Sequence, residues 1–182
     1  MKKIVMVVCF LFVAGTISAQ KYYTKTGETD FKASVDAFEP VEAKSNSTTA
    51  ILKVDSGDLA ALLFMKSFHF KVALMEEHFN ENYMDSDKFP KATFKGKLKD
   101  FSMSDVSATA KEYKLSGTLT VRGKDRAIET TAMISKDGDK VIIKSFFTVK
   151  PQDFDIEIPS IVRDKIAKEI NVTLNYELVE KK

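Results

Sequence analysis

The stretch that decides the fold is Leu115-Ser116-Gly117-Thr118-Leu119-Thr120-Val121. Its odd positions carry leucine, glycine and valine, and its even positions carry serine and threonine. Successive side chains of a β-strand point to opposite faces, so this alternation predicts a strand with one buried face and one solvated face. Strands of this kind are typical of an antiparallel sheet that covers a core on one side.

The same alternation recurs on both sides of this stretch. It is regular in residues 92–98 and 170–178, and shorter runs predict the remaining strands. Those runs lie near residues 29–36, 48–54, 58–70, 127–135 and 140–150. Two tight turns separate neighbouring runs: Arg122-Gly123-Lys124-Asp125, and the strong hairpin signal Asp137-Gly138-Asp139.

Two segments lack the strand alternation and predict short helices. Residues 72–82 carry good helix formers, with apolar residues spaced to share one face. Pro159 could open a second helix over residues 159–168. With no internal repeat or long linker, the sequence predicts one all-β domain, an antiparallel barrel of about eight strands with one or two short helices. A barrel of that size either holds one small ligand or is filled by its own side chains.

Residues 1–19 predict a secretory signal peptide rather than a part of the domain. A basic start at Lys2 and Lys3 is followed by an apolar run over residues 4–14 and then by small residues up to Ala19. The run is shorter than the roughly 20 residues that a membrane-spanning helix needs, which disfavours the alternative of a retained anchor. We therefore expect cleavage after Ala19, a domain over residues 20–182 without a membrane span, and a periplasmic or secreted location.

Composition excludes several classes of function. The 182 residues contain 28 Lys+Arg, 26 Asp+Glu, two histidines and one cysteine, Cys9, which lies in the expected signal peptide. Without Lys2 and Lys3 the basic and acidic residues balance, whereas a nucleic-acid-binding domain usually shows a basic excess. The expected mature chain has no cysteine, which excludes an internal disulfide, a cysteine nucleophile and a Cys-rich zinc site.

No catalytic or metal-binding constellation stands out in the sequence. Glycine-rich phosphate loops, G-x-S-x-G and H-E-x-x-H do not occur. Glu77 and His78 are adjacent, and adjacent helical side chains point in different directions. For His69, in a strand-like run between two phenylalanines, an exposed or hydrogen-bonded side chain is a simpler interpretation than a metal ligand. The acidic residues in 81–87 do not match calcium-loop spacing, so we expect no enzyme, no resident cofactor and no metal site.

Phenylalanines are concentrated in or beside the expected strands. They include Phe64, Phe68, Phe70, Phe94, Phe147 and Phe154. Apolar strand faces fill a small barrel as well as they line a cavity, and periodicity alone does not separate these two cases.

Three motifs along the chain point to a known family. The first is Lys66-Ser67-Phe68-His69-Phe70, followed after the expected helix by Phe89-Pro90-Lys91-Ala92-Thr93-Phe94. The second is the strand and turn Gly117-Thr118-Leu119-Thr120-Val121-Arg122-Gly123, and the third is Asp153-Phe154-Asp155-Ile156. Together these motifs resemble the YceI-like family of exported bacterial proteins, and the resemblance covers residues 22–179.

The resemblance implies a lipocalin-like barrel whose interior holds a long isoprenoid or similar amphiphilic lipid, for transport or storage. Such a ligand binds through apolar area, at roughly 0.8 kcal/mol per buried methylene, without a reactive group. From the inward faces of the expected strands, we expect a cavity lined by Leu63, Met65, Phe68, Phe70, Phe94, Leu119, Val121, Ile143, Phe147, Val149 and Phe154. The alternative is a non-catalytic stress-response or protein-interaction module with a filled barrel. The expected partner is thus a lipid and not a nucleic acid, and the charge balance leaves a homodimer open.

Overall fold

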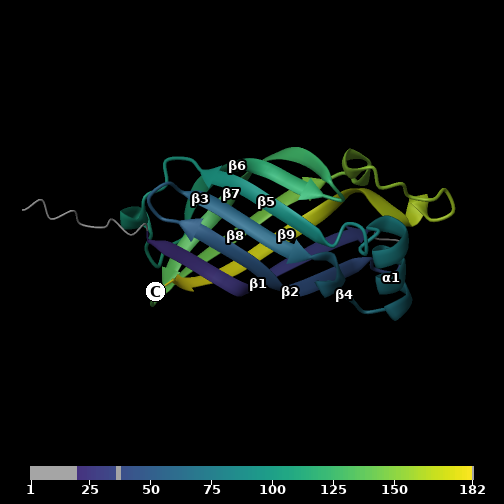
Figure 1. Ribbon diagram of the computed structural model, residues 1–182, viewed down its shortest axis with the longest axis horizontal. Coiled ribbons are helices and arrows are strands. Elements are labelled where there is room, and N and C mark those ends of the chain that lie inside the picture. Colours follow the sequence, from purple (N-terminus) through teal and green to yellow (C-terminus); the bar gives the residue numbers. More distant parts are fainter. Residues whose placement is uncertain (1–19, 36–37, 182) are drawn as a thin grey trace, which may run out of the picture.

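Nine β-strands run through residues 20–35 and 38–181, the part of the chain that the computed structural model describes (Figure 1). They are β1 (Lys21–Ser34), β2 (Glu42–Lys53), β3 (Asp58–Phe64), β4 (His69–Phe70), β5 (Lys91–Leu98), β6 (Lys111–Val121), β7 (Lys124–Asp137), β8 (Lys140–Val149) and β9 (Ile166–Glu180). Within this part of the chain, the α-helix α1 (Ala73–His78) runs directly into the π-helix η2 (Phe79–Tyr83). Short 3₁₀ helices make up the rest: η1 (Met65–Ser67), η3 (Met103–Asp105), η4 (Pro151–Phe154) and η5 (Arg163–Lys165).

Eight of these strands close into an antiparallel barrel. Neighbouring strands pair in the order β1-β9-β8-β7-β6-β5-β3-β2, and β1 also pairs with β2, which completes the ring. The two-residue strand β4 adds to β2 through the pair Ala43↔Phe70. Closure removes the free edges that an open sheet would expose. The predicted all-β class, antiparallel pairing and strand number are confirmed.

The alternating stretch Leu115–Val121 lies in β6, with its apolar side chains facing inward as predicted. Leu115 is buried inside the barrel, and Ser116 and Thr118 are exposed on its outer surface. The predicted turn to β7 has positive φ angles at both Arg122 and Gly123, the conformation of a two-residue hairpin turn that matches the twist of paired strands.

The predicted strand over residues 58–70 is interrupted. It divides into β3 and β4 because η1 stands between them, and the Ser67 hydroxyl donates to the Phe64 carbonyl oxygen at 2.6 Å across that turn. A serine that bonds to a nearby backbone carbonyl offers the chain an alternative to the strand ladder. The prediction of one continuous strand was therefore wrong.

The second predicted helix, over residues 159–168, was also wrong. Only the turn η5 forms there, and Ile166 already pairs with Ser34 of β1. Strand pairing with β1 thus occupies the end of this segment and leaves too few residues for a helix. The first predicted helix, residues 72–82, is confirmed as α1 and η2, and β1 starts at Lys21, well before the predicted residue 29.

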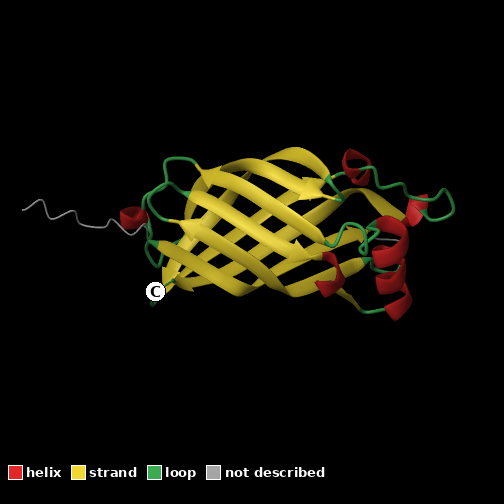
Figure 2. Cartoon of the chain, in the orientation of Figure 1, coloured by secondary structure: helices red, strands yellow, loops and turns green. Residues whose placement is uncertain are grey.

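The barrel has two unlike ends. The closed end carries the β2–β3 and β7–β8 turns and residues 99–110 between β5 and β6. The open end carries α1, η2 and residues 150–165 between β8 and β9, and Figure 2 shows most of the helices gathered there. Among the described residues, no helix is long and apolar enough to cross a membrane. The expected signal peptide, residues 1–19, lies outside the described residues.

A hydrophobic core fills the closed end. We call it the closed-end core, and it consists of Tyr22, Ala50, Leu52, Leu59, Leu98, Val106, Tyr113, Leu115, Ala132, Ile134, Val141, Ile143, Tyr176 and Leu178. Phe101 and Met103, in the segment between β5 and β6, pack against it. This segment therefore caps the barrel, and burial of these side chains stabilises the fold by about 1.5–3 kcal/mol for each large apolar residue.

Candidate ligand cavity

A cavity of about 590 Å³ occupies the open half of the barrel. Its wall consists of inward-facing side chains from the eight barrel strands, joined by side chains from α1, η2 and the β8–β9 segment. Most of these side chains are aliphatic or aromatic. Such a space favours an apolar molecule, because hydrocarbon placed there leaves water without losing hydrogen bonds.

Ten of the residues expected to line a cavity lie on this wall. They are Leu63, Met65, Phe68, Phe70, Phe94, Leu119, Val121, Phe147, Val149 and Phe154. Ile143 does not lie there, since it packs in the closed-end core with 1% of its surface exposed. It shares the inward face of β8 with Phe147, but at about 3.3 Å per residue it lies roughly 13 Å away along the strand, in the direction of the closed end. The expectation that Ile143 lines the cavity is therefore corrected: its side chain faces inward but packs in the closed-end core.

The sequence analysis missed several wall residues. On β9 these are Ile170, Val172 and Leu174, which belong to the alternating run over 170–178 and could have been selected from it. Met75 and Phe79, from the helical segment, also line the cavity. No strand periodicity points to these two, because their position depends on how the helices pack across the open end.

Four phenylalanine rings attach the helices to the barrel. Phe31 of β1 lies 5.0 Å from Phe68, 5.7 Å from Phe70 and 5.3 Å from Phe79, measured between ring centroids. Phe79 also contacts Phe68 and Phe70 at 5.7 and 5.2 Å. Aromatic pairs at these separations add about 0.5–1.5 kcal/mol each to simple burial, so this group holds η2 against the wall.

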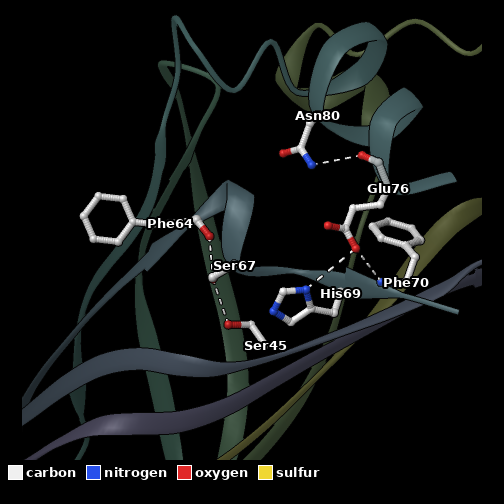
Figure 3. A network of polar contacts seen from close by, with 7 residues as sticks. All are labelled: Ser45, Phe64, Ser67, His69, Phe70, Glu76 and Asn80. Carbon is white, nitrogen blue, oxygen red and sulfur yellow. Dashed lines mark hydrogen bonds and ion pairs between the residues drawn. The ribbon is translucent and has the colours of Figure 1, made fainter. Parts of the chain in front are cut away.

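A polar network fixes α1 from the outside (Figure 3). The Glu76 carboxylate accepts a hydrogen bond from the Phe70 backbone N–H at 3.1 Å and lies 3.7 Å from the His69 Nδ1 atom. The Asn80 side-chain amide donates to the Glu76 backbone carbonyl at 2.9 Å. His69 itself is exposed and does not line the cavity, so in this structure it belongs to the support of the helix.

Three hydroxyl groups meet where the cavity borders the closed-end core. The Thr29 hydroxyl lies 2.8 Å from that of Thr48 and 3.2 Å from that of Tyr176, and all three residues are buried. Burial raises the pKa of the Tyr176 hydroxyl above its ordinary value, and its contacts with the two threonines oppose this rise. The tyrosine therefore stays neutral, and because the hydroxyls bond to one another, this inner end does not require a polar ligand group.

Ionisable side chains of the wall, other than the self-paired Tyr176, are confined to its outer end. Glu39, His78 and Lys165 line the cavity there, and all three are exposed to solvent. Over residues 20–35 and 38–181, no group of three or more metal-ligating side chains comes together.

These features define a class of protein: a closed antiparallel barrel that is packed at one end and holds an apolar cavity at the other. The YceI-like domain matches residues 16–178, which is nearly the whole chain. The chain therefore belongs to the YceI-like family. No curated protein sequence shows a significant match to it.

Solved structures with the same fold come from several bacteria. A polyisoprenoid binding domain from Saccharophagus degradans, implicated in plant cell wall breakdown, is similar with a TM-score of 0.74 and 11% identity, over 90% of this chain and 99% of that one. Burkholderia cenocepacia BcnA gives 0.69 and 16%, over 84% and 96%. The Campylobacter jejuni YCEI protein gives 0.64 and 20%, over 80% and 88%. At these identities the likeness establishes a shared fold.

Proposed function

We propose that this protein binds a polyisoprenoid or a similarly long amphiphilic lipid inside the open half of its barrel, without catalysing a reaction on it. The observation that carries the proposal is the apolar cavity of about 590 Å³. Each methylene placed in such a space contributes roughly 0.8 kcal/mol, so a chain of several isoprene units binds tightly through area alone. Flat phenylalanine rings and flexible methionines suit the irregular outline of a branched chain.

The distribution of charge supports one orientation of this lipid. A polar headgroup loses several kilocalories per mole when it leaves water without a partner. Glu39, His78 and Lys165 lie at the solvent-exposed outer end, whereas the inner end is apolar apart from its self-paired hydroxyls. The lipid chain therefore points inward, and the headgroup stays near the exposed charges.

A role in carrying or storing the lipid outside the cytoplasm follows from the expected signal peptide and from the absence of a catalytic constellation in the sequence. Family membership and the polyisoprenoid binding domain of similar fold support the choice of ligand. The alternative of a protein-interaction module with a filled barrel accounts for the closed end only, since the open end is hollow.

The test is to express the full chain in a bacterial host, purify the exported protein and extract it with organic solvent. Mass spectrometry of the extract is expected to show an isoprenoid or another long-chain lipid in near-stoichiometric amount. A matched protein with Phe68 and Phe94 both changed to aspartate, still folded by circular dichroism, should yield none. Equal lipid content in the two proteins, or no lipid in the wild type even after incubation with polyprenol, would contradict the proposal.

A further inference from the structure

The wall of the barrel is incomplete between β7 and β8. These strands pair from Asp137↔Lys140 to Thr131↔Phe146, and their ladder ends there. Towards the open end, β7 continues to pair with β6 as far as Lys124, and β8 continues to pair with β9 as far as Val149. Only one of the two neighbours of each strand is therefore lost, so β7 and β8 separate from one another while each stays in the sheet.

A hollow of about 370 Å³ occupies this separation, which we call the window. It is lined by residues 127–130 of β7 and 146–148 of β8. Ile128, Thr130 and Phe147 line both this hollow and the main cavity. The window thus lies on the outer side of wall residues that also line the cavity.

Polar contacts bound the window at both ends. At the inner end, the Thr130 hydroxyl donates to the Phe146 carbonyl oxygen at 2.7 Å, in the place where the next ladder contact would be expected. At the outer end, the Lys124 ammonium lies 2.6 Å from the Asp155 carboxylate, which joins the start of β7 to the segment after β8. The gap is therefore an enclosed opening and not a slit that runs to the end of the barrel.

The sequence does not force this opening. A proline would prevent a ladder hydrogen bond, but neither residues 124–130 nor residues 147–149 contain one. Unpaired backbone N–H and C=O groups on two facing strand edges are a cost that closed barrels otherwise avoid. A gap retained directly beside the ligand cavity is consistent with a use for it.

The outer side next to the window is apolar. Phe146 is 55% exposed at its edge, and Met133, diagonal to it across the β7–β8 ladder, is 39% exposed. Inside the window, the apolar side chains of Ile128 and Phe147 also belong to the cavity wall, and Glu129, Thr130 and Thr148 add polar groups to the hollow. The outer end of the barrel offers a different route, because there a chain must pass the polar side chains of Glu39, His78 and Lys165.

We propose that the window between β7 and β8 is a lateral passage through which the apolar chain of the ligand enters and leaves the cavity. This inference rests on the proposed lipid-binding function. A passage sets the rates of association and dissociation together and leaves the equilibrium affinity unchanged, because it does not alter the bound state.

The test is a reversible cross-link across the window. Extending the register Thr131↔Phe146 by two residues places Glu129 opposite Thr148, and both side chains are exposed. Cysteines at these two positions, in a chain with Cys9→Ser, should close the window on oxidation. The control carries cysteines at Ser135 and Ile142, which already pair on the same two strands away from the window. Where the gap exceeds the roughly 7 Å Cα separation that a disulfide spans, a bis-methanethiosulfonate reagent joins the same cysteines through two disulfides, which a reductant also cleaves.

The probe is cis-parinaric acid, a fluorescent long-chain fatty acid, mixed with each protein in a stopped-flow instrument. With the window cross-linked, association and dissociation should both slow by about tenfold or more, with an affinity within about twofold of the uncross-linked form. Reduction of the disulfide should restore both rates, and the control should show no change. Unchanged rates in a fully cross-linked protein would overturn the passage while leaving lipid binding intact. Failure of the wild-type protein to bind the probe at all would overturn the proposed function and the passage with it.

Discussion

The two ends of the barrel are built from the same strands and the same alternation, yet one is solid and the other hollow. On β8, Val141 and Ile143 are fully buried in the closed-end core, whereas Phe147 and Val149 on the same face are only partly buried. On β9, Leu178 is fully buried and Val172 is not. The difference follows from what covers each end: a compact apolar segment packs into the closed end, and helices arch over the open one.

This comparison indicates that the closed end stabilises the fold and that the open end accommodates a ligand. Tightly packed interiors supply most of the stability of a domain, and cavities reduce it. A chain whose expected mature form lacks disulfides depends on one well-packed region, which here is the closed end. The open end can then keep its side chains apart and leave room for a ligand.

The largest expected effect is the loss of lipid binding when a charge is placed on the cavity wall. Phe147→Asp is expected to abolish lipid retention, because an ionised carboxylate against a hydrocarbon chain is strongly unfavourable. The domain should remain folded, since the new group lies in a cavity open to water. Mass spectrometry of solvent extracts measures the retention.

The matched control is Val179→Asp, which places the same charge at an exposed position on the outer face of β9. It should retain lipid like the wild type. If Phe147→Asp folds and still retains lipid, or if the control loses it equally, the assignment of Phe147 to the ligand wall is incorrect.

The next effect compares one residue type at both ends. Ile143→Ala in the closed-end core should lower the free energy of unfolding by about 2–5 kcal/mol, because it leaves a new void. Ile170→Ala on the cavity wall should cost only about 1 kcal/mol, because it enlarges a space that already exists. Urea unfolding measures both values, and titration with cis-parinaric acid should be weakened only by Ile170→Ala. Equal costs would mean that the open end is packed as tightly in solution as the closed end.

A smaller effect is expected at the level where the two ends meet. Gly96 and Gly117 face each other on β5 and β6, and the Phe94 ring lies over both. A Cβ atom at Gly117 would stand 2.5 Å from the Gly96 Cα and 2.7 Å from the Phe94 ring, so the backbone and the ring must both shift. Gly117→Ala should cost about 1–3 kcal/mol of stability and weaken lipid binding, whereas the outward-facing Ser116→Ala should do neither. Thermal unfolding and probe titration would show whether the two residues differ in this way.

The smallest effect concerns the ion pair at the outer boundary of the window. The Lys124 ammonium, which donates a hydrogen bond to the Asp155 carboxylate, holds the pKa of that carboxyl below its ordinary value. A carboxyl with a lowered folded-state pKa stabilises the fold above its unfolded-state pKa, and this contribution is lost as the pH falls through the folded-state value. Asp155→Asn should therefore be slightly less stable than the wild type at neutral pH, and the difference should vanish in strong acid. Unfolding free energies at a series of pH values test this, and a pH-independent difference would contradict it.

Much of the fold was predictable because strand periodicity is a local property. The alternation in residues 115–121 and 170–178 correctly oriented β6 and β9, and the two glycine-containing turns lie where expected. The break at η1 and the loss of the second helix were not predictable, because a side-chain bond from Ser67 and strand pairing at Ile166 decide them. Neither contact can be recognised from the alternation of apolar and polar residues in the sequence.

The sequence by itself determined which side chains face inward, since a strand turns every second residue to the same side. It also determined that those faces are apolar and aromatic, as in an all-β barrel, and it carries the motifs that resemble the YceI-like family, to which the domain match over residues 16–178 assigns it. Only the tertiary structure decided how far along the axis each inward residue lies, which separates Ile143 in the solid half from Phe147 in the hollow half. Only the tertiary structure showed that the pairing between β7 and β8 ends at Thr131↔Phe146. The physical reason is that depth, packing and the pairing of distant strands depend on contacts between segments far apart in the chain, whereas facing depends only on neighbouring residues.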